Sequence, residues 1–401
     1  MKRRFDIVIA GAGMVGLTIA ALIARSEIAG DLSVTIIDAG DEPEFDTDRD
    51  IDLRVSALSP GSAKTLASAG AWESIRSTRS CAFDAMRVWD SKGCIDGPET
   101  LRFDAADFAL PQLGYIVENE LIRYRLLQQI AASGISIHFN TSLRRLLAAD
   151  GRFLLESDGG PSLRPELVIA ADGGNSFVRE QAGLQTRSWR YGQTAFVTHL
   201  QTERHHARTA WQRFLPSGPL AFLPLEDGRV SIVWSTSDQQ ARDALAASDD
   251  ELAKLLGEAS DGVLGKVAPA GPRAAFPLHA RYARHYAIPG LVLVGDAAHS
   301  VHPLAGQGVN LGLADAAQLV SAIGTAFANG EHPGDLPVLR RYERARKGEN
   351  QLMLRFIDGI ARLFASEAEP LERLRGTGMR LFNRSGPLRR LAIEQALGLR
   401  R

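Results

Sequence analysis

Three features that mark other protein classes are missing from this sequence: a set of cysteines, a long apolar run and an excess of charge. Only two of the 401 residues are cysteines, Cys81 and Cys94, which excludes a disulfide framework and leaves too few ligands for a metal site. The formal net charge is −1, so no overall field favours nucleic acid. No stretch approaches the ~18 apolar residues of a membrane span. We expect a cytoplasmic protein, with peripheral membrane contact left open.

Internal repeats, low-complexity tracts and long linkers are also absent. The first residues, MKRRFDIVIAGAG, are basic and then apolar, but the apolar run is short, contains Asp6 and leads into glycines. This start therefore predicts a β-strand rather than a signal peptide. With 45% hydrophobic and 23% charged residues, the chain has the composition of an enzyme with a large core and two domains.

Two kinds of sequence pattern alternate along the chain. Strand, glycine turn and helix patterns predict an α/β, Rossmann-like dinucleotide-binding domain, and a β-rich stretch with the hairpin signal Asp227-Gly228 predicts an inserted antiparallel domain with one helix, DDELAKLLGEA. The dinucleotide-binding parts are residues 1–75, 109–184 and 278–337. The substrate domain takes residues 76–108 and 185–277, and residues 338–401 form an arginine-rich helical region.

The first motif is the glycine turn Gly11-Ala12-Gly13-Met14-Val15-Gly16, which follows a strand and opens a helix. Gly11 permits the tight turn, Gly13 lets a pyrophosphate approach the backbone, and Gly16 lets the helix pack on the strand. Asp38 ends the next strand, near the spacing of a ribose-binding carboxylate. The turn predicts a bound dinucleotide without choosing between NAD and FAD.

The second motif is VIAADGGNSFVRE, in which Asp172, Ser176 and Arg179 follow an apolar strand. On the residues alone, a ligand-binding turn and an ordinary strand-to-helix turn capped by Asp172 or Ser176 are equally good interpretations.

The third motif is GLVLVGDAAHSVHPLAGQGVNLGLAD. Gly295 and Asp296 end a buried strand, where α/β sheets bind ligands. Gly306 and Gly308 then open a helix, although glycine disfavours helix interiors. We interpret these glycines as clearance for a planar cofactor whose negative charge the helix N-terminus would stabilise. The alternative is that they only relieve crowding between two elements.

The order of GxGxxG, DGxxSxVR, GDAAH and HPLAGQGxNxGxxD resembles that of the FAD-dependent aromatic hydroxylases with the para-hydroxybenzoate hydroxylase fold. HPLAGQGVNLGLAD, DLRVSALSPGS and GYIVENELIRYRLL are similar to segments of the ubiquinone-biosynthesis hydroxylase family. The resemblance spans nearly the whole chain.

The resemblance implies roles for individual residues along the FAD molecule. Gly11, Gly13 and Gly16 would hold the pyrophosphate, and Asp38 the adenosine ribose. The other implied cofactor-binding residues are Arg54 by the flavin and pyrophosphate, Glu118 or Asn119 beside the FAD, Asp172 for FAD and the nicotinamide donor, and Gly295 and Asp296 at the ribityl chain. The flavin's reactive edge would be lined by Pro303, Gly306, Gln307 and Gly308, and its pyrimidine ring by the backbone of Val309 and Asn310.

The resemblance also implies the reaction. Reduced flavin and O2 would form a C4a-hydroperoxide that hydroxylates the ring of a polyprenylated phenol in ubiquinone biosynthesis. Because the chain has one GxGxxG, NADH or NADPH would bind transiently as reductant. A hydroxylase of a small soluble aromatic and a non-catalytic scaffold or lipid-binding subunit remain alternatives.

Residue type alone suggests further candidates. A catalytic base or proton path could use Tyr191, His199, His279 or His302. The substrate domain supplies Phe196, Trp211, Phe214, Phe222, Leu223 and Trp234, which are core or pocket residues. The arginines beyond residue 338 predict either a solvated helix face or contact with the inner membrane or with other biosynthetic proteins. A homo-oligomer is left open.

Overall fold

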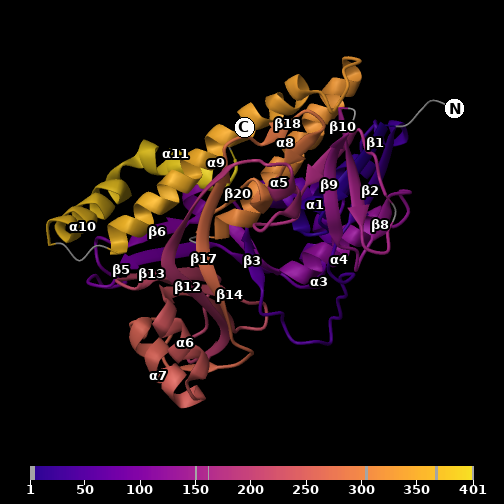
Figure 1. The fold of residues 1–401 in the computed structure, drawn as a ribbon. Coiled ribbons are helices and arrows are strands. Elements are labelled where there is room, and N and C mark those ends of the chain that lie inside the picture. Colours follow the sequence, from indigo (N-terminus) through magenta and orange to yellow (C-terminus); the bar gives the residue numbers. More distant parts are fainter. Residues whose placement is uncertain (1–4, 150, 161, 303–305, 366–368, 400–401) are drawn as a thin grey trace.

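The computed structural model describes residues 5–149, 151–160, 162–302, 306–365 and 369–399 (Figure 1). One sheet has the strand order β18-β19-β11-β1-β2-β8, in which only the short edge strand β18 pairs antiparallel. Its strands are β1 (Phe5–Ala10), β2 (Leu32–Ile37), β8 (Ser136–His138), β11 (Leu167–Ala170), β18 (Ala287–Ile288) and β19 (Leu291–Leu293). The strands are apolar because helices cover both faces, as parallel sheets require.

The strand order reverses between β1 and β11. The chain runs from β1 through β2 to β8, and then returns to β11 on the other side of β1. In doubly wound sheets a ligand crevice lies at the carboxyl ends of the strands at such a reversal. Gly11 directly follows β1 and Asp172 closely follows β11, so the first two motifs meet at this edge.

Helix α1 (Met14–Ala24) starts at the glycine turn and contacts both α4 (Asn119–Ile130) and α8 (Gln307–Ala328). Contrary to expectation, α8 has the length and apolar composition of a membrane span, but half of that stretch is buried inside the protein. Its neighbours α1, α2 (Pro60–Ser68) and α9 (Leu336–Ala365) make it a core helix.

A small sheet of order β3-β7-β4 joins the two main parts of the molecule. Its strands are β3 (Val55–Leu58), β4 (Cys81–Phe83) and β7 (Gly114–Glu118). The helix expected after Ser59 is two helices, α2 and α3 (Trp72–Thr78), because Gly70 between them has a φ of +82°. Ser59 caps α2 and Pro60 stands in its first turn, as the sequence predicts.

The second large sheet has the order β20-β17-β12-β15-β14-β13-β5-β6, with β16 paired to β12. Its strands are β5 (Ala85–Asp90), β6 (Leu101–Asp104), β12 (Thr186–Thr202), β13 (Thr209–Leu215), β14 (Gly218–Pro224), β15 (Val230–Ser237), β16 (Val267–Pro269), β17 (Ala274–Ala283) and β20 (His299–Ser300). The shorter elements elsewhere are the hairpin of β9 (Leu143–Ala149) and β10 (Arg152–Ser157), helix α5 (Phe177–Gln181), and the 3-10 turns η1 (Ala29–Asp31), η2 (Ala105–Phe108) and η3 (Gly295–Ala297).

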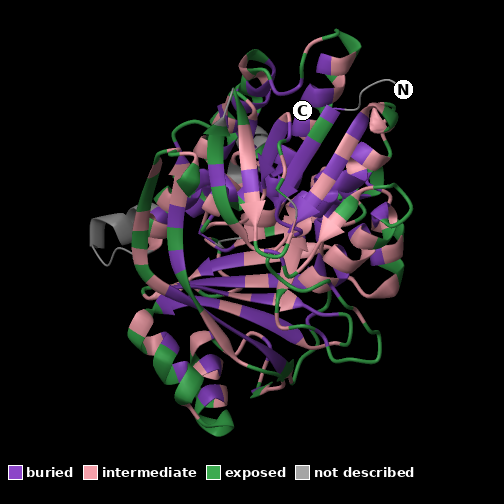
Figure 2. Ribbon diagram, turned by 45° about the vertical axis from the view of Figure 1, so that its right-hand side comes forward, coloured by how far each residue is buried: buried purple, intermediate pink, exposed green. Residues whose placement is uncertain are grey.

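The two faces of this second sheet differ. Phe196, Phe222 and Trp234 pack in a core with α6 (Asp238–Ala246) and α7 (Asp249–Ala259), and Trp211 packs against that core. Side chains alternate along strands, so the opposite face is turned toward the small sheet and α9, where Leu223 and Phe214 lie. Figure 2 shows the strands largely buried and the outer sides of α6 and α7 exposed.

One expectation about helix content was wrong, and two expected divisions of the chain fall inside secondary-structure elements. The β-rich stretch holds two helices, since α6 precedes the expected α7. The division expected at residue 277 falls inside β17, which stays paired with β12 up to Ala283. The division at residue 338 falls inside the first turn of α9, which is followed by α10 (Glu369–Arg384) and α11 (Gly386–Ala396).

Candidate functional site

The glycine turn after β1 is built from contacts between backbones. Gly11 has a φ of +105°, and a Cβ there would lie 2.4 Å from the carbonyl oxygen of Ala171. A Cβ at Gly16 would lie 2.0 Å from the carbonyl oxygen of Gly11. A Cβ at Gly13, by contrast, would meet nothing within 4 Å. The N-terminus of α1 therefore faces open space, and no side chain caps it.

The carboxylate of Asp38 is bound to the glycine turn itself. It accepts hydrogen bonds from the backbone N–H of Ala12 and, at 2.7 Å, from that of Gly40. Arg123, on α4, was not singled out from the sequence, yet its Nε donates to the carbonyl oxygen of Ala12 at 3.2 Å. Its position in an ordinary amphipathic helix pattern gave no signal for this contact.

The Asp172 turn combines both interpretations of its motif. Ser176 caps α5, and Asp172 Oδ2 accepts a hydrogen bond from the Val178 N–H at 3.0 Å. Asp172 Oδ1 is buried and has no hydrogen-bond partner in the described part of the chain. Burial raises the pKa of this carboxyl. A carboxylate oxygen that is buried without a donor fits a ligand that brings hydroxyl or amide donors.

Arg179 connects this turn to the third motif. Its guanidinium donates to the carbonyl oxygens of Gly174 and Ala297, each at 2.9 Å. Asp296, just before Ala297, is exposed to solvent although protein surrounds it on most sides. Burial raises the pKa of its carboxyl, and His299 and Arg54 oppose that rise. Asp172, Asp296 and the glycine turn thus lie around one edge of the parallel sheet.

The start of α8 is held by Asn310. Gly306 precedes α8 with a φ of +62°, and a Cβ there would lie 3.1 Å from that of Ala57. The Asn310 side chain donates to the carbonyl oxygens of Ala57 and Gly306 and accepts from the Ser59 N–H, each at 2.9 Å. From the sequence, only the backbone of Asn310 was expected to have a role, at the pyrimidine ring of the flavin. Val309 is partly buried beside it, Gln307 and Gly308 form the first turn, and Pro303 lies outside the described residues.

A buried ionic cluster lies one turn further along α8. Asp315 Oδ2 bonds His299 Nε2 at 2.6 Å and the Gly295 N–H at 3.1 Å, while Oδ1 accepts from Arg346 at 2.7 Å and Asn350 at 3.1 Å. Burial alone would raise the pKa of Asp315, but His299 and Arg346 outweigh it and lower the pKa to about 2. Asp315 is the only acid of α8 and the last residue of the motif HPLAGQGVNLGLAD, but the sequence assigned it no role.

Glu118 and Asn119, expected beside the cofactor, make contacts within the protein. Both carboxylate oxygens of Glu118 accept hydrogen bonds from Arg79, at 2.7 and 2.9 Å, and Oε1 also accepts from the Asp52 N–H. Asn119 accepts a hydrogen bond from the Ser56 hydroxyl at 2.6 Å, and its N–H donates to the carbonyl oxygen of Arg54. These two residues hold the segment that carries Arg54.

Two of the candidate bases, His302 and Tyr191, contact each other at the start of the motif HPLAGQGVNLGLAD. His302 is buried against Tyr191, with ring centroids 4.9 Å apart. Burial lowers the pKa of His302 to about 4 and raises that of Tyr191 to about 12. His199 is buried near Arg229, on the sheet face turned to the small sheet, and His279 is exposed.

Comparisons with known proteins identify the family of this chain. A family model described as an FAD binding domain matches residues 4–356. The 3-demethoxyubiquinol 3-hydroxylase of Escherichia coli K12 is 37% identical over 395 residues, which cover 98% of each chain. The mitochondrial ubiquinone biosynthesis monooxygenase COQ6 of Mus musculus is 34% identical over 430 residues, covering 96% of this chain and 89% of the relative.

Solved structures share the fold. The p-nitrophenol 4-monooxygenase PnpA of Pseudomonas putida superposes with a TM-score of 0.77 at 18% identity over the full length of both chains. PqsL of P. aeruginosa gives a TM-score of 0.76 at 20% identity, covering 94% of this chain and 99% of that one. At these identities the structures speak for the fold alone. The sequence matches go further: this chain belongs to the ubiquinone-biosynthesis hydroxylases, a family of FAD-dependent monooxygenases, and FAD is its cofactor.

Proposed function

We propose that the protein hydroxylates the aromatic ring of a polyprenylated phenol in ubiquinone biosynthesis, with O2 as co-substrate and NADH or NADPH as transient reductant. The relatives at 34–37% identity carry names of ubiquinone hydroxylases, which supports the substrate class. FAD supplies oxygen activation once it is reduced. The protein has to hold FAD, place the ring and exclude water.

The observation that carries this proposal is the side of the second sheet turned to the FAD-binding part. The side chains on that side are small: Ala195, Ala221 and Val233. The residues next to them in the sequence, Phe196, Phe222 and Trp234, point to the opposite side. Ala221 and Val233 are only partly buried although they lie in the middle of the sheet. Small apolar side chains with residual exposure fit the surface on which a planar apolar ring rests.

Phe276 extends this surface toward the cofactor residues. It pairs with Ala195 across β12 and β17, so both side chains stand on the same side of the sheet. Its ring is 40% exposed and lies 5.6 Å from the Arg54 guanidinium. An exposed aromatic ring beneath a cation suits an electron-rich phenol, whose developing negative charge Arg54 would stabilise.

The residues of this chain also suit the cofactor's charge changes. Reduced flavin carries negative charge, and the N–H groups at the start of α8, at the positive end of the helix dipole, would stabilise it. Gly308 contributes by keeping its first turn bare, since a Cβ there would find its nearest neighbour 3.9 Å away, at Val301. The buried His302, kept neutral near pH 7 beside Tyr191, would orient the phenol by accepting a hydrogen bond from its hydroxyl.

The test is complementation of bacterial strains blocked at each ring hydroxylation of the quinone pathway, with intermediates read by mass spectrometry. We expect rescue of at least one strain by the wild type and none by Ala221→Phe, which fills the proposed ring surface. Val233→Ala, which removes volume at the neighbouring position, serves as control and should rescue. Failure of the wild type in every strain would contradict the proposal.

Assays with purified protein separate the alternatives. A hydroxylase of a small soluble aromatic would prefer an unprenylated phenol to its prenylated form. A non-catalytic subunit would form no oxygen-dependent product even when yellow with FAD.

We further propose contact between α9 and an anionic membrane surface, which would bring a lipid-tailed substrate within reach. Leu352 and Phe356 are 64% and 57% exposed, and Arg355 and Arg362 stand at helical spacing on the same exposed face. Flotation with liposomes containing anionic lipid tests this contact. Leu352→Glu/Phe356→Glu should abolish flotation, and Leu245→Glu, at an exposed leucine of α6, should not. Equal flotation of all three proteins would contradict the contact.

A further inference from the structure

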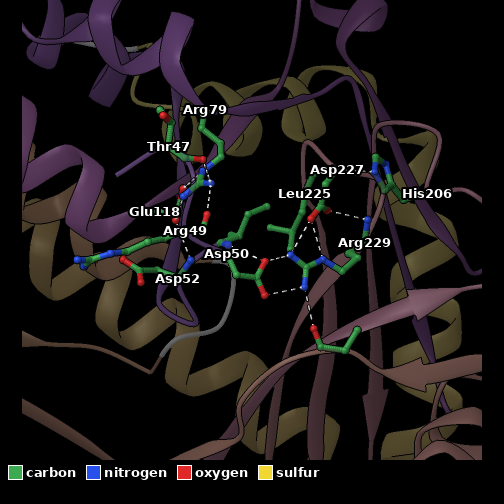
Figure 3. Close-up of polar contacts among 12 residues, drawn as sticks. Thr47, Arg49, Asp50, Asp52, Arg79, Glu118, His206, Leu225, Asp227 and Arg229 are labelled. Atoms are coloured by element: carbon green, nitrogen blue, oxygen red, sulfur yellow. Dashed lines mark hydrogen bonds and ion pairs between the residues drawn. The ribbon is translucent and has the colours of Figure 1, made fainter. Parts of the chain in front are cut away.

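The loop between β2 and β3, residues 38–54, ends at Arg54 and is held first from the FAD-binding side. Arg79, at the end of α3, forms a two-pronged ion pair with Glu118 of β7 (Figure 3). Its third nitrogen donates to the loop carbonyl oxygen of Arg49 at 2.8 Å. The Asp52 N–H donates to Glu118 at 2.7 Å, so this single arginine–glutamate pair fixes the loop at two points.

The same loop is held a second time, from the other sheet. Arg229, which follows the turn between β14 and β15, places both terminal nitrogens against the carboxylate of Asp50, one of them at 3.2 Å (Figure 3). Its Nε bonds Asp227 at 2.7 Å and Nη1 also donates to the carbonyl oxygen of Ala270 at 2.7 Å. The Arg229 side chain is only 15% exposed, so these partners fix its direction.

Asp50 is the exposed partner of this pair. Its side chain is 63% exposed, and the hydrogen bond from Arg229 lowers its pKa. The next residue, Ile51, is buried in an apolar cluster with Ile116 of the small sheet and Leu225 next to the β14–β15 turn. The loop therefore crosses the junction between the two main parts at Asp50 and Ile51, just before it reaches Arg54.

The loop also forms one wall of a cavity of about 560 Å³, to which Asp41, Asp50, Glu118 and Glu120 contribute. Arg123 connects this wall to the glycine turn, because it donates to the carbonyl oxygens of both Ala12 and Asp41. Movement of the loop would thus change the cofactor site at two places, beside the glycine turn and at Arg54.

We propose that Arg229 is a positioning residue for FAD: its ion pair with Asp50 fastens the 38–54 loop to the second sheet and so slows release of the cofactor. The inference rests on FAD being the cofactor and not on which phenol is hydroxylated. Without the pair, Arg79 still holds the loop, so the protein folds and binds FAD but releases it faster. Substrate-domain residues then govern cofactor retention through a contact outside the flavin site.

The experiment measures FAD release from the purified holoenzyme by the rise in flavin fluorescence on dilution. Asp50→Asn and Arg229→Gln should each release FAD about fivefold faster, the size expected for a partly exposed, two-pronged ion pair. The double variant should be no faster than either single one. Arg229→Lys keeps the charge without the fork and should restore the rate in part. Salt should accelerate release from the wild type but not from the variants.

Arg208→Gln is the matched control. Arg208 forms a two-pronged pair with Asp84 at 2.9 Å beside the same sheet. Its side chain is more exposed than that of Arg229, 52% against 15%, and among the described residues no hydrogen bond joins it to the loop. We expect wild-type release from this variant, and unchanged melting temperatures of all apoproteins within a few degrees. Wild-type release rates in Asp50→Asn and Arg229→Gln would overturn the proposal, as would equal acceleration by Arg208→Gln.

Discussion

Two helices begin beside the cofactor site, and they are held in place by different means. The start of α1 is fixed by backbone contacts that only glycine at positions 11 and 16 allows, one with Ala171 and one within the turn itself. The start of α8 is fixed by side chains from distant segments, through Asn310 to the β3–α2 junction and through Asp315 to His299 and Arg346. A local motif builds the first anion site, whereas tertiary structure builds the second.

The difference teaches where each helix start is vulnerable. Substitutions at α1 act through steric overlap with the backbone, which cannot move away. Substitutions at α8 act through unpaired polar groups, whose cost depends on burial. Four changes separate these two mechanisms, and they are ordered here from the largest expected effect to the smallest.

Gly11→Ala should have the largest effect. The new Cβ would overlap the Ala171 carbonyl, and a φ of +105° is strained for any residue with a Cβ. We expect no folded holoenzyme, measured as loss of soluble yellow protein. Gly13→Ala is the control, since its Cβ meets nothing within 4 Å. It should fold with an unchanged melting temperature and bind FAD weakly; equal damage by both changes would contradict the assignment.

Asp315→Asn should come next, at about 3–5 kcal/mol of unfolding free energy, because it removes the buried charge partner of Arg346 and leaves only the more exposed Glu349. Urea unfolding of the apoprotein measures this loss. Glu331→Gln, which breaks the more exposed pair with Arg341, should cost less than about 1 kcal/mol. Similar losses in the two variants would show that the α8–α9 cluster is no more than a surface ion pair.

His302 should give a pH-dependent effect of intermediate size. Burial lowers its pKa to about 4 from 6.5, so the unfolded chain binds this proton more readily than the folded one. Stability is therefore unaffected above pH 6.5 and falls between pH 6.5 and 4, by on the order of 3 kcal/mol. His302→Gln should remove that part of the pH dependence. Identical stability-versus-pH curves for wild type and variant would refute the assignment.

Gly308→Ala should have the smallest effect on the fold. Its Cβ would find its nearest neighbour at 3.9 Å and helix propensity improves, so apoprotein stability should rise by up to about 1 kcal/mol. If the bare turn is clearance for flavin, FAD affinity should fall at the same time. Isothermal titration of apoprotein with FAD provides the check. Unchanged affinity would contradict clearance for flavin as the reason for this glycine.

The contrast between α1 and α8 also explains how much the sequence could predict. The spacing of Gly11, Gly13 and Gly16 after a strand predicted the turn and its helix, but not the contact of Gly11 with Ala171. At α8 the sequence predicted a helix opened by glycines. It did not predict the four hydrogen bonds of the Asn310 side chain, whose partners include Ala57, Ser59 and Ser62. No local sequence pattern indicates a hydrogen-bond partner about 250 residues away in the chain.

The second sheet shows the same limit. Alternating aromatics in β12, β14 and β15 predicted strands but not which side of the sheet faces the cofactor. The structure resolves this through long-range contacts, since Phe196, Phe222 and Trp234 meet α6 and α7. Glu118 illustrates a different limit: the family pattern suggested Glu118 or Asn119 beside the cofactor, and the structure adds a two-pronged pair with Arg79 that no local pattern indicated.

The position of α9 has a consequence for synthesis of the protein. Arg346 and Asn350, which neutralise and hydrogen-bond Asp315, come late in the chain, whereas the glycine turn is translated first. A nascent chain therefore exposes a phosphate-binding turn long before the opposite wall of the site can form. We therefore expect cofactor loading after translation, so that cells short of flavin accumulate full-length apoprotein that later addition of FAD converts to holoenzyme.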